Sequence, residues 1–133
     1  MKDRDGKFII KSVAVYLRKS RSESEKDLDN HRNTLVGVCI RQGWEYNLFE
    51  EIASGESLEM RPEAQKLLKY IEEELYDAVV VMDIDRLSRS GNSEFENIKK
   101  ILIDSNTMLV IKDRALDLAN AQDDMTYRHL LQS

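Results

Sequence analysis

A serine lies among cationic side chains directly after the first apolar stretch of the chain. The segment from Val13 to Ser22 reads VAVYLRKSRS. In an extended chain alternate side chains share a face, so Arg18 and Ser20 are predicted to point the same way, and Lys19 and Arg21 the other way. A planar guanidinium matches a pair of phosphate oxygens. A hydroxyl beside a guanidinium therefore suggests a serine that attacks a phosphodiester.

A second charged cluster, Asp83, Asp85, Arg86 and Arg89, follows another apolar run, and Arg61 closes a polar loop over residues 53–60. Phosphoryl transfer needs positive groups where the phosphate oxygens gather charge, an in-line nucleophile and a proton donor for the departing oxygen. Arginine supplies the first of these without a metal ion. The sequence contains no Walker A motif, and no histidine is near Ser20 in sequence.

Each of these residues also has a common structural role. A single serine after a strand is usually a turn or helix-cap residue, and exposed arginines are commonly solvated partners of acidic groups. Asp83 and Asp85 would also suit a metal site or a turn. The spacing of His31 from the apolar residues of its helix favours a packed or hydrogen-bonded role.

The elements that must position these residues alternate in type along the chain. Strands are predicted at 13–17, 46–52, 78–82, 108–111 and 115–118, and the continuous apolar run of the third is typical of a strand covered on both faces. Helices are predicted from Ser24 (with Asp27 in a capping box) to a stop at Gly43, from Pro62 through Leu75, from a capping box at Ser93 and Glu96, and from Asp123 onward. This order predicts an α/β fold with a mostly parallel sheet of four to five strands flanked by helices. In a flavodoxin-like strand order the first and third strands are neighbours, so both charged clusters would meet at one sheet edge.

Composition narrows the class of protein. The 133 residues suit one domain, and their net charge of -5 argues against a general basic surface for DNA. No stretch approaches the length of a membrane span, and the single cysteine, Cys39, cannot form an intrachain disulfide. We expect a cytoplasmic protein with no membrane partner.

Together the motifs resemble the catalytic domain of the serine recombinases, the resolvase and invertase family. YLRKS at Tyr16 to Ser20 is similar to the family's tyrosine-x-arginine-x-serine motif, and DRLSR at Asp85 to Arg89 matches its aspartate-arginine-leucine-x-arginine motif. ASG at 53–55, followed by Arg61, resembles the mobile loop that carries another active-site arginine. The sequence around Ser20 resembles that of the large serine integrases more than that of the small resolvases.

The resemblance implies a resolvase-like fold and a site-specific recombinase that cleaves and rejoins double-stranded DNA. Ser20 would form a 5'-phosphoserine link, Arg18, Arg61, Arg86 and Arg89 would bind the phosphate, and Asp85 would donate a proton or organise the arginines. The family uses no metal or nucleotide cofactor and acts as dimers that pair into a synaptic tetramer. The implied organisation is a charged leader at 1–12, a catalytic domain at 13–122 and the start of a long oligomerisation helix at 123–133, with the DNA-reading regions outside this chain.

Two other hypotheses remain at this stage. A receiver-like switch would use Asp83 as its phosphoacceptor, but Arg18 and Lys19 stand where a receiver needs an acidic pair. A non-catalytic self-association module with the same fold would not require Ser20. The sequence does not indicate the DNA site or whether the outcome is integration, excision or inversion.

Overall fold

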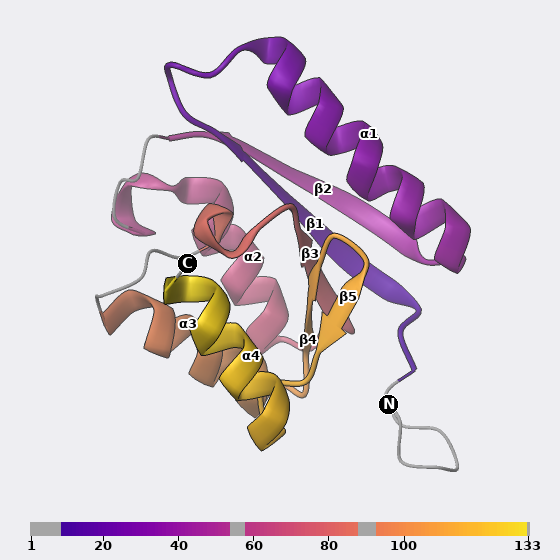
Figure 1. The fold of residues 1–133 in the computed structure, drawn as a ribbon, viewed down its shortest axis with the longest axis vertical. Coiled ribbons are helices and arrows are strands. Elements are labelled where there is room, and N and C mark those ends of the chain that lie inside the picture. The colour runs from indigo at the N-terminus through magenta and orange to yellow at the C-terminus, as the bar shows by residue number, and fades with distance from the viewer. Residues whose placement is uncertain (1–8, 54–57, 88–92, 133) are drawn as a thin grey trace.

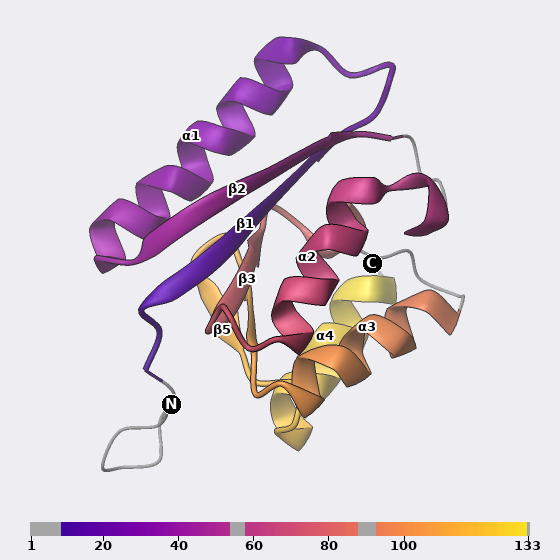
Figure 2. The ribbon, with the colours of Figure 1, turned by 180° about the vertical axis from the view of Figure 1, so that it is seen from behind.

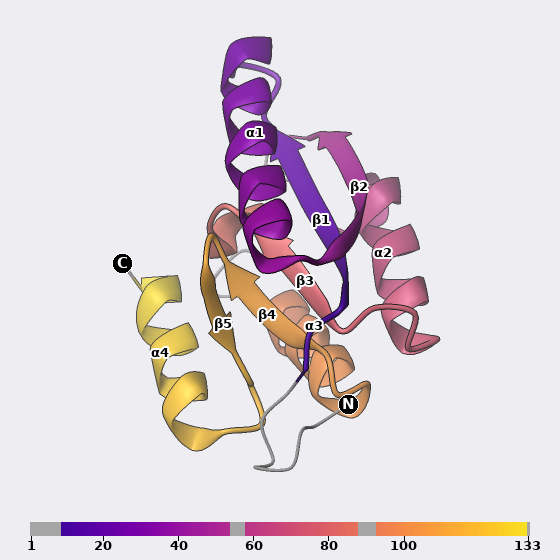
Figure 3. The same cartoon turned by 90° about the vertical axis from the view of Figure 1, so that its right-hand side faces the viewer.

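A five-stranded sheet forms the centre of the protein. The computed structural model describes residues 9–53, 58–87 and 93–132 of the chain. The strand order is β2-β1-β3-β4-β5, with bounds β1 Ser12–Lys19, β2 Glu45–Ile52, β3 Ala78–Val81, β4 Met108–Ile111 and β5 Arg114–Leu116. The first four strands run parallel, and β5 pairs antiparallel with β4 (Figure 3). The predicted mostly parallel sheet, with the first and third strands adjacent, is confirmed.

Helices cover both faces of this sheet. Helix α1 (Glu25–Gln42) lies on one face, and α2 (Pro62–Glu72), α3 (Ser93–Asp104) and α4 (Ala121–Gln132) lie on the other (Figures 1 and 2). Two short 3-10 turns, η1 (Leu58–Met60) and η2 (Ile84–Arg86), follow β2 and β3. The crossovers between the parallel strands carry α1, α2 and α3, as expected for the α/β class, and α4 follows β5.

The residues of β1 divide between two apolar cores. Val13, Val15 and Leu17 pack toward α1, whereas Ala14 and Tyr16 belong to the larger core under α2, α3 and α4. All four residues of β3 are buried, in agreement with the prediction of a strand covered on both faces. Because successive side chains of a strand alternate, Arg18 continues the face of Tyr16 and Lys19 continues the face of Leu17.

The ends of α1 follow the predicted chemistry. The hydroxyl of Ser24 accepts from the N–H of Asp27, and the carboxylate of Asp27 accepts from the N–H of Ser24, which forms the capping box. At the other end Gly43 adopts a left-handed conformation with φ 73°, which a residue without Cβ takes most easily. Pro62 is the first residue of α2, also as predicted.

Several predicted bounds were wrong. Helix α2 ends at Glu72, so Leu75 lies beyond it and is 54% exposed rather than part of the apolar stripe. Helix α4 begins at Ala121 instead of Asp123, because the side chain of Asn120 accepts from the N–H groups of Gln122 and Asp123 and caps the helix earlier. Strand β5 is shorter and earlier than predicted, and the register with β2 extends β1 to Lys19.

None of the helices in the described part of the chain combines the length and the apolar character needed to cross a membrane.

Candidate active site at the carboxyl ends of the parallel strands

Arg18 and Arg86 connect the ends of β1 and β3 through reciprocal hydrogen bonds. Nε of Arg18 donates to the carbonyl of Arg86 at 3.1 Å, and Nη1 of Arg86 donates to the carbonyl of Arg18 at 3.0 Å. Nη1 of Arg18 also donates to the carbonyl of Ala53 at 2.7 Å, beyond the end of β2. The guanidinium of Arg18 thus holds three strand ends together, which β1 permits because it lies between β2 and β3.

Ser20 lies one residue beyond β1 and is connected to Arg86 through Glu23. The carboxylate of Glu23 accepts from the N–H of Ser20 at 3.0 Å and from Nη1 of Arg86 at 2.8 Å. The N–H of Glu23 donates to Oγ of Ser20 at 3.1 Å, and Oγ of Ser22 lies at the same distance from that oxygen. The predicted nucleophile and one predicted phosphate ligand therefore share one carboxylate.

Arg61 is held against the segment that follows β3. It is 2% exposed and precedes the first turn of α2. Nη1 of Arg61 donates to the carbonyl of Leu87 at 2.9 Å, and Nη2 is ion-paired with Glu94 of α3. Glu94 also accepts from the N–H of Leu58 at 3.0 Å and so ties the start of η1 to α3.

A carboxylate from β2 binds the start of α2, the helix that Arg61 precedes. Glu51 accepts from the hydroxyl of Tyr16 at 2.6 Å and from the N–H groups of Glu63 and Ala64, at 3.0 and 3.3 Å, in the first turn of α2. A carboxylate there is favoured by the helix dipole and satisfies free amide donors. Burial, followed by the hydrogen bond to Glu51, raises the pKa of the Tyr16 hydroxyl, so Tyr16 stays neutral.

The electrostatics of the site reflect a concentration of cations. Burial, together with the neighbouring guanidiniums of Arg61 and Arg86, lowers the pKa of Arg18, although it remains charged at neutral pH. The pKa of Arg86 is raised: burial acts to lower it, but the hydrogen bond to Glu23 and the charge of Asp83 outweigh burial. The hydrogen bond from Arg86 is the largest cause that lowers the pKa of Glu23 to about 2.

The remaining predicted residues are placed only in part. The exposed carboxylate of Asp83 accepts weakly from Nε of Arg86, at 3.4 Å. Asp85 lies within η2, but its side chain is outside the described residues, and so is Arg89. The structure thus brings together Ser20, Arg18, Arg61 and Arg86 around one segment, while the predicted contacts of Asp85 and Arg89 stay predictions.

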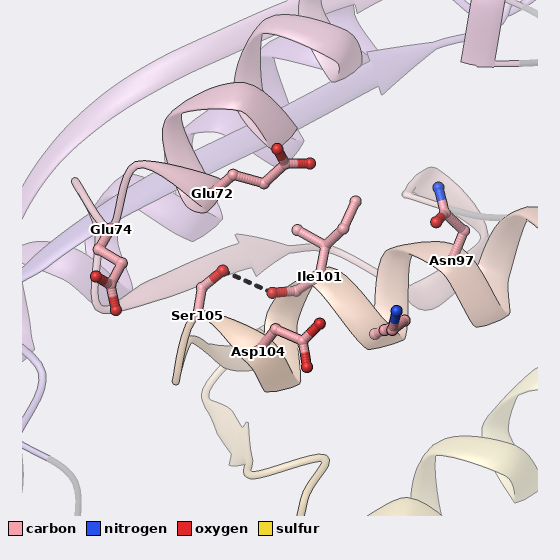
Figure 4. Close-up of a pocket in the computed structure, with 7 residues that line it drawn as sticks. Glu72, Glu74, Asn97, Ile101, Asp104 and Ser105 are labelled. Atoms are coloured by element: carbon pink, nitrogen blue, oxygen red, sulfur yellow. Dashed lines mark hydrogen bonds between the residues drawn. The ribbon is translucent and has the colours of Figure 1, made fainter.

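A hollow elsewhere in the fold is separate from this cluster. A cavity of about 500 Å³ lies between the ends of α2 and α3 (Figure 4), lined by Glu72, Glu74, Asn97, Lys100, Ile101, Asp104 and Ser105. Both helices lead into parallel strands, so their last turns lie at the opposite end of the sheet from Ser20. Within the described ranges, no three His, Cys, Asp or Glu side chains gather as a metal ion would require.

Comparison with known families agrees with this geometry. The family model described as "Resolvase, N terminal domain" matches residues 13–132. The chain belongs to the resolvase family. As in other members, this resolvase-family domain is the catalytic domain of a serine-type site-specific DNA recombinase, and the receiver-like interpretation is set aside.

Solved structures similar to this resolvase-family domain are also recombinase domains. The N-terminal catalytic domain of TP901-1 integrase is 28% identical, with a TM-score of 0.71, and the match covers 90% of this chain and 91% of that one. The catalytic domain of ISC1926 TnpA, an IS607-like serine recombinase, is 20% identical, with a TM-score of 0.67 and coverages of 91% and 96%. A serine recombinase from Sulfolobus solfataricus is 24% identical, with a TM-score of 0.63 and coverages of 89% and 77%. The last two show the same fold.

Sequence reasoning missed three carboxylates of this resolvase-family domain: Glu23, Glu51 and Glu94. A signal for Glu23 was present, since Ser20 and Glu23 have the capping-box spacing S-x-x-E. Glu51 and Glu94 contact residues far away in sequence, and their partners depend on how β2, α2 and α3 pack. Spacing along the chain therefore offered no signal for these two.

Proposed function

We propose that Ser20 is the nucleophile of DNA strand cleavage in this domain. Its Oγ attacks a backbone phosphorus, an Oγ–P bond forms as the P–O3' bond breaks, and the products are a 5'-phosphoserine and a free 3'-hydroxyl. The serine proton leaves to a base, and the departing 3' oxygen takes up a proton. Since one phosphodiester replaces another, the step is reversible and strand exchange followed by rejoining needs no nucleotide.

The observation that supports this proposal most is the connected set Ser20, Glu23, Arg86 and Arg18. Charge-assisted hydrogen bonds run from Arg86 to the carboxylate that also binds the backbone of Ser20. A phosphate brought to Ser20 would meet the same guanidinium. In this mechanism Arg18, Arg86, Arg61 and Arg89 stabilise the transition-state charge, which preorganised donors do effectively in a partly buried site.

The departing 3' oxygen needs a proton donor. Asp85, next to Arg86 in the second motif, is our candidate for the proton donor to the 3' oxygen or for the organiser of the arginines. Arg61 would contribute from the start of α2, over the end of the 53–60 loop.

We further propose that the substrate is double-stranded DNA at a specific recombination site, reached by dimers that pair into a synaptic tetramer through the helix that begins with α4. The net charge of -5 fits a domain whose DNA grip is local and supplemented by basic regions elsewhere. The likeness to TP901-1 integrase favours the large serine integrases as its branch of the family. A reaction on DNA is consistent with a cytoplasmic location.

The test is to trap the covalent adduct with the parent recombinase and its cognate DNA. A site with a nick that prevents rejoining accumulates the protein–DNA link, and mass spectrometry of the digested adduct identifies the modified residue. We expect the link on Ser20, its loss in Ser20→Ala, and its retention in Ser22→Ala, a matched change two residues away. An adduct on Ser22 or on a tyrosine, or full recombination by Ser20→Ala, would refute the assignment.

A further inference from the structure

The carboxylate of Glu23 occupies the donors that surround Ser20. Its Oε1 accepts from the N–H of Ser20 at 3.0 Å and from Nη1 of Arg86 at 2.8 Å, while Oε2 lies 3.4 Å from Nη2 of Arg86. One backbone amide and both terminal nitrogens of a guanidinium thus converge on two oxygens of a single anion. The same donor set suits two non-bridging oxygens of a phosphodiester, because carboxylate and phosphate both accept a guanidinium fork.

We propose that Glu23 is a built-in competitor for the scissile phosphate, and that DNA must displace its carboxylate from Arg86 and from the N–H of Ser20 before cleavage. The inference rests on the proposed function and extends it to the resting state of the same site. It makes Glu23 a positioning residue, which holds Arg86 and Ser20 in place and occupies their donors until the DNA phosphate displaces its carboxylate.

The nucleophile itself is covered by the same residue. The N–H of Glu23 donates to Oγ of Ser20 at 3.1 Å, so Ser20 and Glu23 form both bonds of a capping box. A lone pair of Oγ that accepts this bond is not free to attack phosphorus. Displacement of the Glu23 side chain removes the reciprocal bond to Ser20 and loosens the turn that holds Oγ.

The Ser20–Glu23 capping box is not needed to cap α1, because a second capping box follows it. Helix α1 begins with the capping box of Ser24 and Asp27, so the amide groups of its first turn do not depend on Glu23. The carboxylate of Glu23 is directed instead to Arg86, 63 residues away in sequence.

A competing anion can release the carboxylate of Glu23 from Arg86, whereas protonation at neutral pH cannot. The hydrogen bond from Arg86 lowers the pKa of Glu23 to about 2, so the carboxylate stays charged at neutral pH and is not removed by protonation. A phosphodiester monoanion carries the same charge on two non-bridging oxygens, which can accept from Arg86 in place of the carboxylate as the DNA approaches. Exchange of one anion for another leaves the net charge of the site unchanged.

The experiment titrates dimethyl phosphate, a phosphodiester without bases, into isotopically labelled protein and follows the amide of Ser20 and Nε of Arg86 by NMR. Glu23→Gln keeps a side chain that a capping box accepts but removes the charge that competes for Arg86. A neutral acceptor holds a guanidinium about half as strongly as a charged one, so we expect dimethyl phosphate to bind roughly 5-fold more tightly to this variant.

Two controls make the result specific. Glu25→Gln removes the same charge from an exposed residue nearby and should leave the affinity within about 1.5-fold of the unchanged protein. In the double variant Glu23→Gln with Arg86→Ala the gain should vanish, because the guanidinium that the phosphate would use is gone. Circular dichroism of each variant verifies that the fold is retained.

Equal or weaker binding of dimethyl phosphate by a folded Glu23→Gln variant would overturn the inference. Such a result would mean that Glu23 organises the turn but does not compete with the phosphate for Arg86. A gain of the same size in Glu25→Gln would overturn it as well, by assigning the effect to net charge. Neither result would contradict the proposed function, which is tested separately by identifying the Ser20 adduct.

Discussion

Replacing Glu51 by alanine is expected to destabilise the domain strongly, although the residue has no predicted role in chemistry. Glu51 is 7% exposed and accepts from the buried hydroxyl of Tyr16 and from the N–H groups of Glu63 and Ala64. Alanine removes the acceptor of all three donors. The hydroxyl of Tyr16 is enclosed by the core under α2, so it would be left without its strongest partner.

The magnitude follows from the donors. A buried polar group that loses its partner costs about 1 to 3 kcal/mol, and loss of the acceptor at a helix start costs about 1 kcal/mol. For Glu51→Ala we therefore expect a loss of about 3 kcal/mol in the free energy of unfolding, a large part of the ~5 to 15 kcal/mol typical of whole domains. Glu51→Gln retains an uncharged acceptor and should lose about 1 kcal/mol.

Urea unfolding followed by circular dichroism measures these differences as shifts of the midpoint at a constant slope. Glu45→Ala is the matched control, because Glu45 begins the same strand and is exposed, and its change should stay within about 0.5 kcal/mol. If Glu51→Ala and Glu45→Ala unfold at the same urea concentration, the reasoning that Glu51 joins Tyr16 to the start of α2 is refuted.

Two further predictions concern α1 and the site beside it. Gly43→Ala is expected to lower the free energy of unfolding by about 1 kcal/mol. Gly43 ends α1 at φ 73° with open space around it, so backbone strain alone opposes a side chain there. An unchanged urea midpoint would contradict this prediction. The folded pKa of Glu23, about 2, lies below its ordinary value, so its contribution to stability is full above about pH 4.5 and is lost as the pH falls toward 2. Over that range Glu23→Gln should lose less stability on acidification than the unchanged protein, measured by thermal unfolding, and parallel pH profiles would contradict the assignment.

The order and type of the elements were readable from local patterns. The buried run of β3, the capping box at Ser24 and the left-handed Gly43 each depend on residues a few positions apart, and the structure confirms them. The alternation of strand and helix then leaves few topologies, because crossovers between parallel strands share one hand. The fold and the place of Ser20 and Arg86 at one sheet edge followed from this.

Bounds were less predictable where a single side chain decided them. The amide donors at the start of α4 bind the side chain of Asn120, three residues before the predicted start, and α2 stops at Glu72 although the apolar spacing continues to Leu75. Such ends depend on which groups satisfy the free amides and carbonyls of the helix, and the periodicity of the sequence does not report them.

The sequence by itself determined which groups enter the site: a serine and its arginines follow strands whose apolar pattern predicts a parallel sheet, and parallel strands bring their carboxyl ends to one edge. Only the tertiary structure decided how those charges are balanced. Glu23 pairs with Arg86 across 63 positions and Glu94 with Arg61 across 33, and these partners meet because β1, β3, α2 and α3 pack as they do. The physical reason is that hydrogen bonds act over a few ångströms in space, whatever the separation along the chain.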